Sequence, residues 1–526
     1  MPALSWKQQP PSGKFDAIVI GSGMGGLTAA VLLAKEGRKR VLVLEQHYRL
    51  GGYTHTFTRP GYEWDVGVHY VGQVGEKGQL RGAYERLTEG RLRWAALPDV
   101  YDRVELGGRG YDFPSGTRRW LERMVQYFPR EEVALRRYVT LAKETALQSS
   151  GFFLARAFPP AVTRALHGTV SRGFLSRARR TTAQVLGELT VNEELKAVLT
   201  GQYGDYGLPP SRSSWAMHAT LVTHYFGGGW YPVGGSAAFV EAMAPVIEAH
   251  GGHLATYARV KALAVEGGKV VGVRMEDETE LRAPVVISDA GLFNTARLLP
   301  PEQVPAEWSR ALTTVSRSSS YFSLCLGFRQ TDAELGLGGT NLWLYPDEKH
   351  DHNVARFEAD PSAPFPMVYV SFPSAKDPEW SRRFPGRATV DVITMAKFDW
   401  FSRWQDTRWK KRGADYEAFK QEMAERLLEV VFRRLPQLRG KVDAMEATTP
   451  LTTAHFAGHQ RGELYGLDHT PERYSFELHP RGGVPGLLLT GVDTMTCGVS
   501  GAMVSGVLTA GAVVGPWAAI KTLRPA

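Results

Sequence analysis

A short apolar run that leads directly into a glycine-rich turn restricts the fold of this chain more than any other feature. Residues 15–20 read FDAIVI, residues 21–26 read GSGMGG, residues 27–36 have the apolar periodicity of a helix, and residues 41–44 are again wholly apolar. A buried parallel strand, a tight turn, a helix and a second parallel strand explain this order. The sequence therefore predicts a Rossmann-type βαβ unit in an α/β fold.

The glycine spacing within this unit predicts a dinucleotide site. Gly21 permits the tight turn, Gly23 lets the backbone approach a pyrophosphate, and Gly26 lets the helix pack closely on the strand. The N-terminus of the helix offers free N–H groups and the positive end of its dipole to the phosphates. Glu45 directly follows the second strand, where its carboxylate can accept hydrogen bonds from ribose hydroxyls.

Two further segments indicate that the dinucleotide is FAD. Gly51 and Gly52 extend the glycine fingerprint in the way seen in FAD-binding oxidoreductases of the glutathione-reductase superfamily. Residues 260–275 are typical of a β-hairpin. In that superfamily this region contacts the adenine, so we expect Val260 to offer a backbone partner to the base.

Residues 486–520 carry the second half of the predicted flavin site. Residues 486–490 read as a buried strand, and Gly491, Asp493 and Gly501 follow in the pattern of the C-terminal flavin motif of the same superfamily. We expect Asp493 to bind a ribityl or pyrophosphate-side oxygen, while the small residues let the next helix approach the flavin ring. The stretch after residue 496 carries no charge up to residue 520, but its many glycines favour a buried helix over a membrane span.

The length of 526 residues exceeds what one hydrophobic core accommodates, so we expect two domains. The expected FAD-binding domain is discontinuous and consists of residues 14–115, 232–300 and 484–526. An α+β substrate domain, with helices in its first segment and an antiparallel sheet in its second, consists of residues 116–231 and 301–483.

Positive charge is concentrated in one segment. The net charge is +8, and residues 145–187 contain six arginines, several phenylalanines and no acidic residue. These arginines are Arg156, Arg164, Arg172, Arg177, Arg179 and Arg180. Arginine interleaved with phenylalanine favours contact with an anionic membrane surface, although a solvated helix face or a phosphate-binding patch has the same composition. No nucleic-acid-binding motif accompanies the charge, so we expect no nucleic-acid partner.

Cysteines and histidines give no sign of a metal site or a disulfide framework. Cys325 and Cys497 fit no metal-ligand spacing. The triplet at residues 350–352 (HDH) has no further ligand cluster beside it. Residues 1–14 are polar and do not read as a secretory signal. We therefore expect a cytoplasmic protein, bound peripherally to a membrane and without a metal.

The sequence around these motifs resembles the carotenoid desaturase/isomerase and retinol saturase family of FAD enzymes, with the retinol saturase (all-trans-retinol 13,14-reductase) branch as the nearest. The elements that carry this closer likeness are residues 51–57 (GGYTHTF), residues 64–72 (WDVGVHYVG), His224 with Tyr225, residues 229–235 (GWYPVGG), and Tyr465-Gly466 with His469. The likeness runs along essentially the whole chain.

The resemblance implies flavin-mediated hydrogen transfer at a carbon–carbon double bond of a hydrophobic polyene, a retinoid- or carotenoid-like isoprenoid. A conjugated chain delocalises the charge that develops when a flavin gives a hydride and a side chain gives a proton. His69, Tyr70, His224 and Tyr225 lie in the branch-specific elements and are the candidate proton donors, and each can equally be a hydrogen-bonded core residue.

We expect saturation of the double bond. Desaturation, cis–trans isomerisation and a non-catalytic lipid-binding flavoprotein are the alternatives. No second dinucleotide fingerprint is present in the sequence. The identity of the external electron donor is therefore left open.

Overall fold

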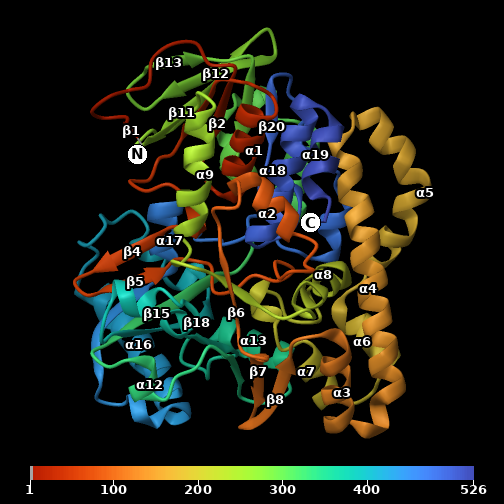
Figure 1. Ribbon diagram of the computed structural model, residues 1–526, viewed down its shortest axis with the longest axis vertical. Helices are drawn as coiled ribbons and strands as arrows, with labels where there is room; N and C mark the ends of the chain where they lie inside the picture. The colour runs from red at the N-terminus through yellow and green to blue at the C-terminus, as the bar shows by residue number, and fades with distance from the viewer. Residues whose placement is uncertain (1–3, 526) are drawn as a thin grey trace.

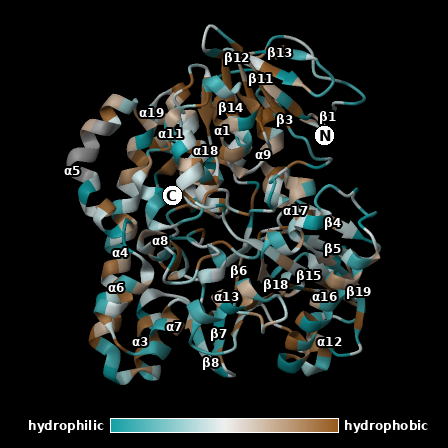
Figure 2. Ribbon diagram, turned by 180° about the vertical axis from the view of Figure 1, so that it is seen from behind, coloured by the Kyte–Doolittle hydropathy of each residue, from teal (hydrophilic) through white to brown (hydrophobic). Residues whose placement is uncertain are grey.

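The computed structural model describes residues 4–525, together with their side chains except those of residue 164 and residues 166–170. In Figure 1 a parallel sheet occupies the upper end of the molecule, a mixed sheet occupies the lower end, and long helices run along one side. Seen from behind in Figure 2, hydrophobic residues concentrate in the strands and helices of the upper end. Both sheets are assembled from segments that are far apart in the sequence.

The parallel sheet takes its strands from both ends and from the middle of the chain. Within residues 4–525, its order is β1 (Leu4–Ser5), β10 (His253–Thr256), β3 (Val41–Leu44), β2 (Ala17–Ile20), β14 (Val285–Ser288) and β20 (Leu487–Leu489). All neighbouring strands pair in parallel. The predicted α/β class and the βαβ unit at the start of the chain are confirmed.

This sheet buries side chains on both faces, as parallel sheets do. Ala17 and Val19 point into a core shared with α1, α9 and α18, whereas Ile18 and Ile20 point into a core shared with a small antiparallel sheet. That small sheet consists of β11 (Val260–Glu266), β12 (Lys269–Met275) and β13 (Glu280–Arg282). Because successive side chains alternate between the faces, a strand between two cores has to be wholly apolar.

The helices around the parallel sheet come from the same segments as its strands. They are α1 (Met24–Lys35), α2 (Arg81–Thr88), α9 (Ala238–Ala249), α10 (Leu292–Leu298), α11 (Ala306–Thr314), α18 (Val499–Val514) and α19 (Pro516–Leu523). Helix α18 is buried against α1, so the uncharged C-terminal stretch forms a core helix as expected. In the described part of the chain, no helix has both the length and the apolar character needed to cross a bilayer.

The mixed sheet is built mainly from the second half of the chain. For the described residues its order is β19 (Val442–Thr448), β15 (Ser320–Phe328), β18 (Ala388–Ala396), β17 (Val368–Ser371), β16 (Asn341–Tyr345), β7 (Val100–Leu106) and β8 (Arg109–Pro114). Strands β16 and β7 pair in parallel, and the other neighbours are antiparallel. Because β7 and β8 lie in this sheet, the expected segment 14–115 does not coincide with the strands of the parallel sheet.

Shorter elements complete the two ends of the molecule. Two small antiparallel pairs are β4 (Thr56–Arg59) with β5 (Tyr62–Asp65) and β6 (Trp94–Ala96) with β9 (Trp230–Pro232). The helices beside the mixed sheet are α12 (Asp332–Leu335), α13 (His350–Ala359), α14 (Pro373–Lys376), α15 (Trp380–Arg383), α16 (Ala414–Arg434) and α17 (Pro450–Ala457).

The long helices along one side come from residues 117–225. They are α3 (Thr117–Tyr127), α4 (Glu132–Leu154), α5 (Pro160–Ala178), α6 (Thr182–Leu189), α7 (Glu193–Leu199) and α8 (Trp215–Tyr225). The expectation of a helical segment between residues 116 and 231 agrees with this arrangement.

The aromatic residues of the basic segment 145–187 face inward. Phe152, Phe153 and Phe174 are buried in the core beside α18. Arg156 is buried with them, because its guanidinium group lies over the Phe152 and Phe153 rings and donates to the carbonyl of Thr494 at 2.5 Å. These residues cannot insert into a bilayer, so a membrane contact of this segment has to come from its exposed residues.

Candidate functional site

The glycine turn between β2 and α1 has the shape that the fingerprint predicts. Gly21 adopts a φ of +95°, in the left-handed region that favours glycine. A Cβ on Gly23 would lie 2.5 Å from Oδ2 of Asp289, and one on Gly26 would overlap the carbonyl oxygen of Gly21. No side chain caps the N-terminus of α1. Glycine is therefore required here because the turn packs closely against itself and against Asp289, and a helix N-terminus that follows such a turn can bind a pyrophosphate.

Glu45 lies at the end of β3 and holds this turn in place. Its carboxylate accepts hydrogen bonds from the backbone N–H (3.0 Å) and hydroxyl (2.6 Å) of Ser22 and from the N–H of His47 (2.8 Å). The Ser22 hydroxyl accepts in turn from the N–H of Gly51 at 2.9 Å. A Cβ on Gly52 would lie 3.0 Å from a Cα atom of the turn. The fold thus brings these predicted residues together, and the bond from Glu45 to a ribose stays a prediction.

The C-terminal motif lies against the same turn. A Cβ on Gly25 would lie 2.8 Å from the backbone nitrogen of Gly491. The carboxylate of Asp493 accepts hydrogen bonds from the N–H of Leu467 at 2.8 Å and from the N–H of Leu292 at 2.6 Å. Asp493 therefore ties three segments of the chain together beside the turn, and its bond to a cofactor oxygen stays a prediction.

Val260 and Gly501 mark two ends of the predicted cofactor site. Val260 begins β11, two residues after Ala258, whose N–H donates to the carbonyl of Glu45 at 2.8 Å. Gly501 lies in the first turn of α18, and no side chain caps this helix at Gly498. The hairpin is thus next to the end of β3, while the positive end of the α18 dipole is free for a ligand.

Asp289, which follows β14, has no role in the sequence-based prediction. Added Cβ atoms on Gly23, Gly25 and Gly491 would lie 2.5, 2.7 and 2.6 Å from its carboxyl oxygens. Burial raises the pKa of Asp289 to about 7. A protonated acid here would not repel a pyrophosphate and could donate a hydrogen bond to it. The polar Asp directly after a buried strand was the available signal.

Tyr70 and Tyr225 are brought together by the fold. Their rings stack with centroids 4.3 Å apart and an interplanar angle of 16°. Asp205 connects the pair to the start of α18, because its Oδ2 lies 3.2 Å from the Tyr70 hydroxyl and its carbonyl oxygen lies 3.8 Å from Sγ of Cys497. Both tyrosines belong to a buried aromatic core. They therefore lie in apolar surroundings near one end of the predicted cofactor site.

The two candidate histidines have different surroundings. Nε2 of His224 accepts a hydrogen bond from the N–H of Gly72 at 2.8 Å, and burial lowers the pKa of His224 to about 4. Nδ1 of His69 lies 3.7 Å from Oδ2 of Asp391, and burial lowers the pKa of His69 to about 3. Both rings are therefore neutral at neutral pH and hold no extra proton to give.

A chain of buried polar groups connects Tyr70 to Lys376. The Tyr70 hydroxyl donates to Oδ2 of Asp102 at 2.9 Å, and Oδ1 of Asp102 accepts from Nδ2 of Asn341 at 2.8 Å. The Lys376 ammonium group donates to Oδ1 of Asn341 and, at 2.6 Å, to the Ser371 hydroxyl. Burial lowers the pKa of Lys376 to about 7. Sequence reasoning missed these residues because they meet only where β7, β16 and α14 come together.

Comparison with known proteins identifies the family. An all-trans-retinol 13,14-reductase from Danio rerio is 38% identical to this chain, over 95% of the chain and 86% of its own length. The chain belongs to the all-trans-retinol 13,14-reductase family. It is therefore an oxidoreductase. A second Danio rerio protein, described as an inactive all-trans-retinol 13,14-reductase, is 33% identical over 95% of the chain and 85% of its own length.

More distant proteins share the fold with this reductase family. Prolycopene isomerase 2 from an Oncidium hybrid cultivar is 27% identical, over 86% of the chain and 75% of its own length. Residues 19–87 match the model of an NAD(P)-binding Rossmann-like domain. The solved structure of cyclohexylamine oxidase from Brevibacterium oxydans IH-35A superposes with a TM-score of 0.61 at 17% identity, over 97% of this chain and 99% of its own. The predicted Rossmann-like fold is thus confirmed.

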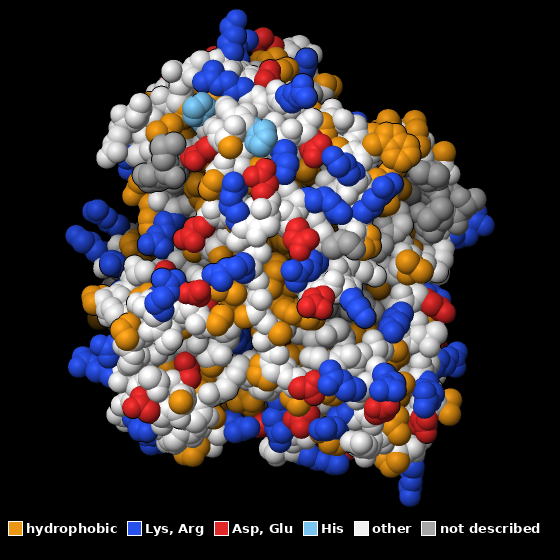
Figure 3. Space-filling view, viewed as in Figure 1, with side chains coloured by type: hydrophobic (Ala, Val, Ile, Leu, Met, Phe, Trp, Pro, Cys, Tyr) orange, Lys and Arg blue, Asp and Glu red, His pale blue; other side chains and the backbone are white. Residues whose placement is uncertain are grey.

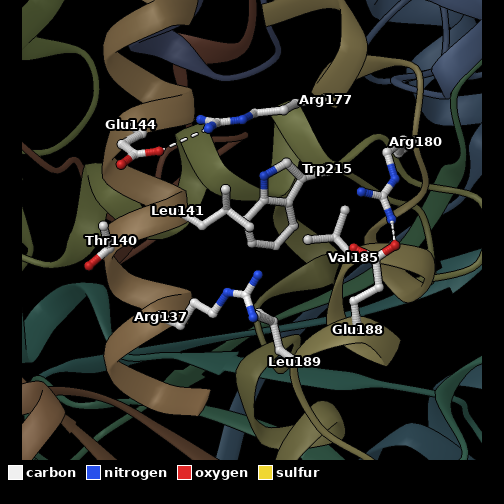
Figure 4. Close-up of a pocket in the computed structure, with 10 residues that line it drawn as sticks. All are labelled: Arg137, Thr140, Leu141, Glu144, Arg177, Arg180, Val185, Glu188, Leu189 and Trp215. Atoms are coloured by element: carbon white, nitrogen blue, oxygen red, sulfur yellow. Dashed lines mark hydrogen bonds and ion pairs between the residues drawn. The ribbon is translucent and has the colours of Figure 1, made fainter. Parts of the chain in front are cut away.

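A cavity of about 420 Å³ lies between the outer helices of this reductase-family chain (Figure 4). Leu141, Leu189 and Trp215 supply apolar lining, and the ion pair of Arg177 with Glu144, at 2.9 Å, lies at its edge. No residue of the glycine turn and neither stacked tyrosine lines this cavity. This cavity is therefore separate from the candidate functional site, which extends from the glycine turn to Tyr70.

Proposed function

We propose that this chain is an FAD-dependent oxidoreductase that saturates a carbon–carbon double bond of a hydrophobic polyene of the isoprenoid class. The stacked pair of Tyr70 and Tyr225 carries the proposal. The pair lies in a buried aromatic core whose apolar rings suit a conjugated chain, and the Tyr70 hydroxyl is bonded to a buried acid. The relatives described as all-trans-retinol 13,14-reductases support reduction as the direction.

The residues around the glycine turn fit FAD bound as in the glutathione-reductase superfamily. The backbone at Gly21, Gly23 and Gly26 would bind the pyrophosphate. A Cβ atom at any of these positions would be crowded, so each of them has to be glycine. The ribose would lie at Glu45 and the adenine at Val260. The ring end would lie at the free N-terminus of α18, with Gly51, Gly52, Gly491, Asp493 and Gly501 around it. The bound cofactor supplies a hydride when it is reduced.

The proton has to come from the chain's own residues, and Tyr70 is the best placed of the four candidates. Its hydroxyl is hydrogen-bonded to Asp102 and lies 3.2 Å from Asp205. His224 uses Nε2 to hold the backbone of Gly72. We therefore assign proton transfer to Tyr70 and positioning of its ring to Tyr225. The buried aromatic surroundings exclude water from this transfer.

Anaerobic incubation of the reduced enzyme with conjugated isoprenoids tests the proposal. The product is expected to be heavier by two hydrogen atoms, with the flavin reoxidised in step, as followed by mass spectrometry and absorbance. A lighter product from the oxidised enzyme would identify a desaturase.

Isomerisation is the second candidate, because a prolycopene isomerase is similar over most of the chain. A product of unchanged mass and altered double-bond geometry would identify that activity. Tight binding of a polyene without any turnover would identify a non-catalytic lipid-binding flavoprotein. We include this outcome because one Danio rerio relative is described as inactive.

We further propose that the chain is cytoplasmic and docks peripherally on an anionic membrane through α5 and the start of α19. Trp517 is 74% exposed and Val162 is 43% exposed, while Arg172 and Arg179 are exposed on α5 and just after it. The two helices lie toward the same upper corner in Figures 1 and 2, and Figure 3 shows a hydrophobic patch at this corner with basic side chains near it. A polyene dissolves in the bilayer, so docking would give direct access to substrate.

A further inference from the structure

The hydroxyl group of Tyr70 lies within hydrogen-bond distance of two carboxyl groups at once. It is 2.9 Å from Oδ2 of Asp102 and 3.2 Å from Oδ2 of Asp205. A phenol has one hydrogen and can donate it to only one of these oxygens. We expect the other carboxyl group to be protonated and to donate to the tyrosine oxygen, because otherwise two acceptors would face each other in a partly buried site.

Asp102 has the surroundings of an ionised carboxylate. Besides Tyr70, it accepts hydrogen bonds from Nε2 of Gln202 at 2.7 Å and from Nδ2 of Asn341 at 2.8 Å. Three donors therefore converge on its two oxygens, and its side chain is wholly buried. An ionised carboxylate, which only accepts, satisfies all three donors.

Asp205 has the opposite surroundings. Among the residues that the structure describes, Tyr70 is the one hydrogen-bond partner of its side chain. Burial, and secondly the nearby negative charge of Asp102, raise the pKa of Asp205 well above its usual range. Burial raises the pKa of Asp102 as well, but the hydrogen bonds from Asn341, Gln202 and Tyr70 oppose that shift. A carboxylic acid at this position donates to the Tyr70 oxygen and leaves the Tyr70 hydrogen for Asp102. Each hydrogen-bond donor then faces an acceptor in the series from Asp205 through Tyr70 to Asp102.

The charges around Asp102 also favour a neutral Asp205. Lys376 contacts Asn341, and the amide of Asn341 connects its ammonium group to Asp102. Burial lowers the pKa of Lys376 to about 7, while the carboxyl groups of Asp102, Asp391 and Asp65 act in the opposite direction, so acids outnumber this one base. An ionised Asp205 would add a further negative charge without a cation beside it, which is unfavourable in a partly buried site.

Starting from the proposed function, we propose that Asp205 is held as a neutral carboxylic acid and stores the proton that Tyr70 gives to the substrate. The hydride for one carbon of the double bond would come from the reduced cofactor, which would be oxidised by two electrons. The neighbouring carbon receives the hydroxyl proton of Tyr70, and the proton of Asp205 passes to the tyrosine oxygen. Asp205 is left as a carboxylate and, because this residue is only partly buried, recovers a proton from solvent before the next turnover.

The protonation state can be tested without any substrate, by comparing Asp205→Asn with the matched change Asp102→Asn. An amide at position 205 donates to Tyr70 as the acid does, so this variant should fold with the stability of the wild type near neutral pH. An amide at position 102 keeps one acceptor oxygen but turns its own hydrogens toward at least one of the three donors, and should lower the melting temperature sharply. The reverse order of stabilities would assign the acid to Asp102 and overturn the proposal.

The pH dependence of unfolding supplies a second readout. A carboxyl group whose folded-state pKa is raised stabilises the fold fully below its unfolded pKa, and this stability is lost as pH rises through the folded value. As pH rises through the folded-state pKa of Asp205, the free energy of unfolding of the wild type should therefore decrease. That of Asp205→Asn should decrease less. The infrared spectrum of the wild type should also contain the C=O stretch of a buried carboxylic acid that the variant lacks. Identical pH profiles and identical spectra would refute a neutral Asp205.

The proposed role of Asp205 in proton transfer to the substrate is tested separately. With the cofactor absorbance unchanged, Asp205→Asn should saturate a polyene about 100-fold more slowly than the wild type and incorporate less solvent deuterium per unit time. An unchanged rate would refute the role as a proton store. A wild type that saturates no polyene would refute the proposed function, while the unfolding and infrared results would still decide the protonation of Asp205.

Discussion

Gly506 in α18 packs directly against Gly25 in α1. A Cβ on Gly506 would overlap the carbonyl oxygen of Gly25 and lie 2.6 Å from Cβ of Thr28. Neither atom belongs to a flexible side-chain end, so Gly506→Ala should force the two helices apart. We expect a loss of about 1–3 kcal/mol in the free energy of unfolding, measured by denaturant titration.

Gly187 provides the matched control for this change. It lies inside α6, and a Cβ there would meet nothing within 4 Å. Gly187→Ala should be neutral or should stabilise the protein by up to about 1 kcal/mol, because alanine loses less entropy in a helix. Equal stability of Gly506→Ala and the wild type would mean that the two helices are not in this close contact.

The glycine turn should fail to retain the cofactor when its backbone is blocked. A side chain on Gly23 would collide with the Asp289 carboxyl group and distort the turn that we propose binds the pyrophosphate. Gly23→Val should therefore be purified with little flavin absorbance, and Glu45→Ala should retain less flavin because the hydrogen bonds to Ser22 and His47 are lost. Gly338→Ala, where a Cβ has open space, should be yellow like the wild type. A folded Gly23→Val protein with a full complement of flavin would contradict the assigned site.

Acid should destabilise this fold through its buried histidines. Burial lowers the pKa of His224 to about 4 and that of His218 to about 3, below the value near 6.5 of an unfolded chain. The stability from each neutral ring is complete above the unfolded pKa and is lost as pH falls toward the folded value. The melting temperature should fall between about pH 6.5 and about pH 4. His224→Gln, whose side-chain oxygen can still accept from Gly72, should show a shallower decline; a slope equal to that of the wild type would exclude His224 as a contributor.

Binding to anionic vesicles should depend on the corner formed by α5 and α19. Trp517→Ser combined with Arg172→Gln and Arg179→Gln should weaken co-sedimentation about tenfold or more, at roughly 1 kcal/mol per basic residue. Arg156 is left unchanged because it is buried and bonded to backbone carbonyls. The control carries Arg329→Gln and Arg382→Gln, whose side chains are 68% and 77% exposed near the mixed sheet. Equal losses in both variants would indicate a general charge effect and remove this corner as the docking site.

The sequence predicts local elements of this fold well where one pattern determines one element. Strand β3 has the predicted bounds at residues 41–44, because an uninterrupted apolar run fits a strand between two cores. The partners of β7 could not be predicted, because an apolar strand pattern does not specify which neighbour it will pair with. Placement of β7 beside β16 brings Asp102 next to Asn341, which is 239 residues further along the chain.

The candidate site likewise has parts that a local sequence pattern predicts and parts that it does not. The close packing of the glycine turn beside Glu45 was predictable because the turn is a local motif with fixed spacing, and the role of these residues in binding a cofactor stays a prediction. The direction in which Phe152 and Arg156 point was not predictable, because basic and aromatic residues alternate both on membrane-facing helices and in helices that pack inward. The stacking of Arg156 over Phe152 makes this second arrangement possible.

The position of β20 at the edge of the parallel sheet has a consequence for how the protein is synthesised. Its pairing with β14 joins residues 487–489 to residues 286–288, about 200 residues earlier. A nascent chain that ends before β20 therefore leaves the edge of β14 unpaired while the glycine turn is already made, and such an edge invites aggregation. Cofactor capture must wait until nearly the whole chain has left the ribosome, so C-terminal truncation should abolish loading however intact the N-terminal motif is.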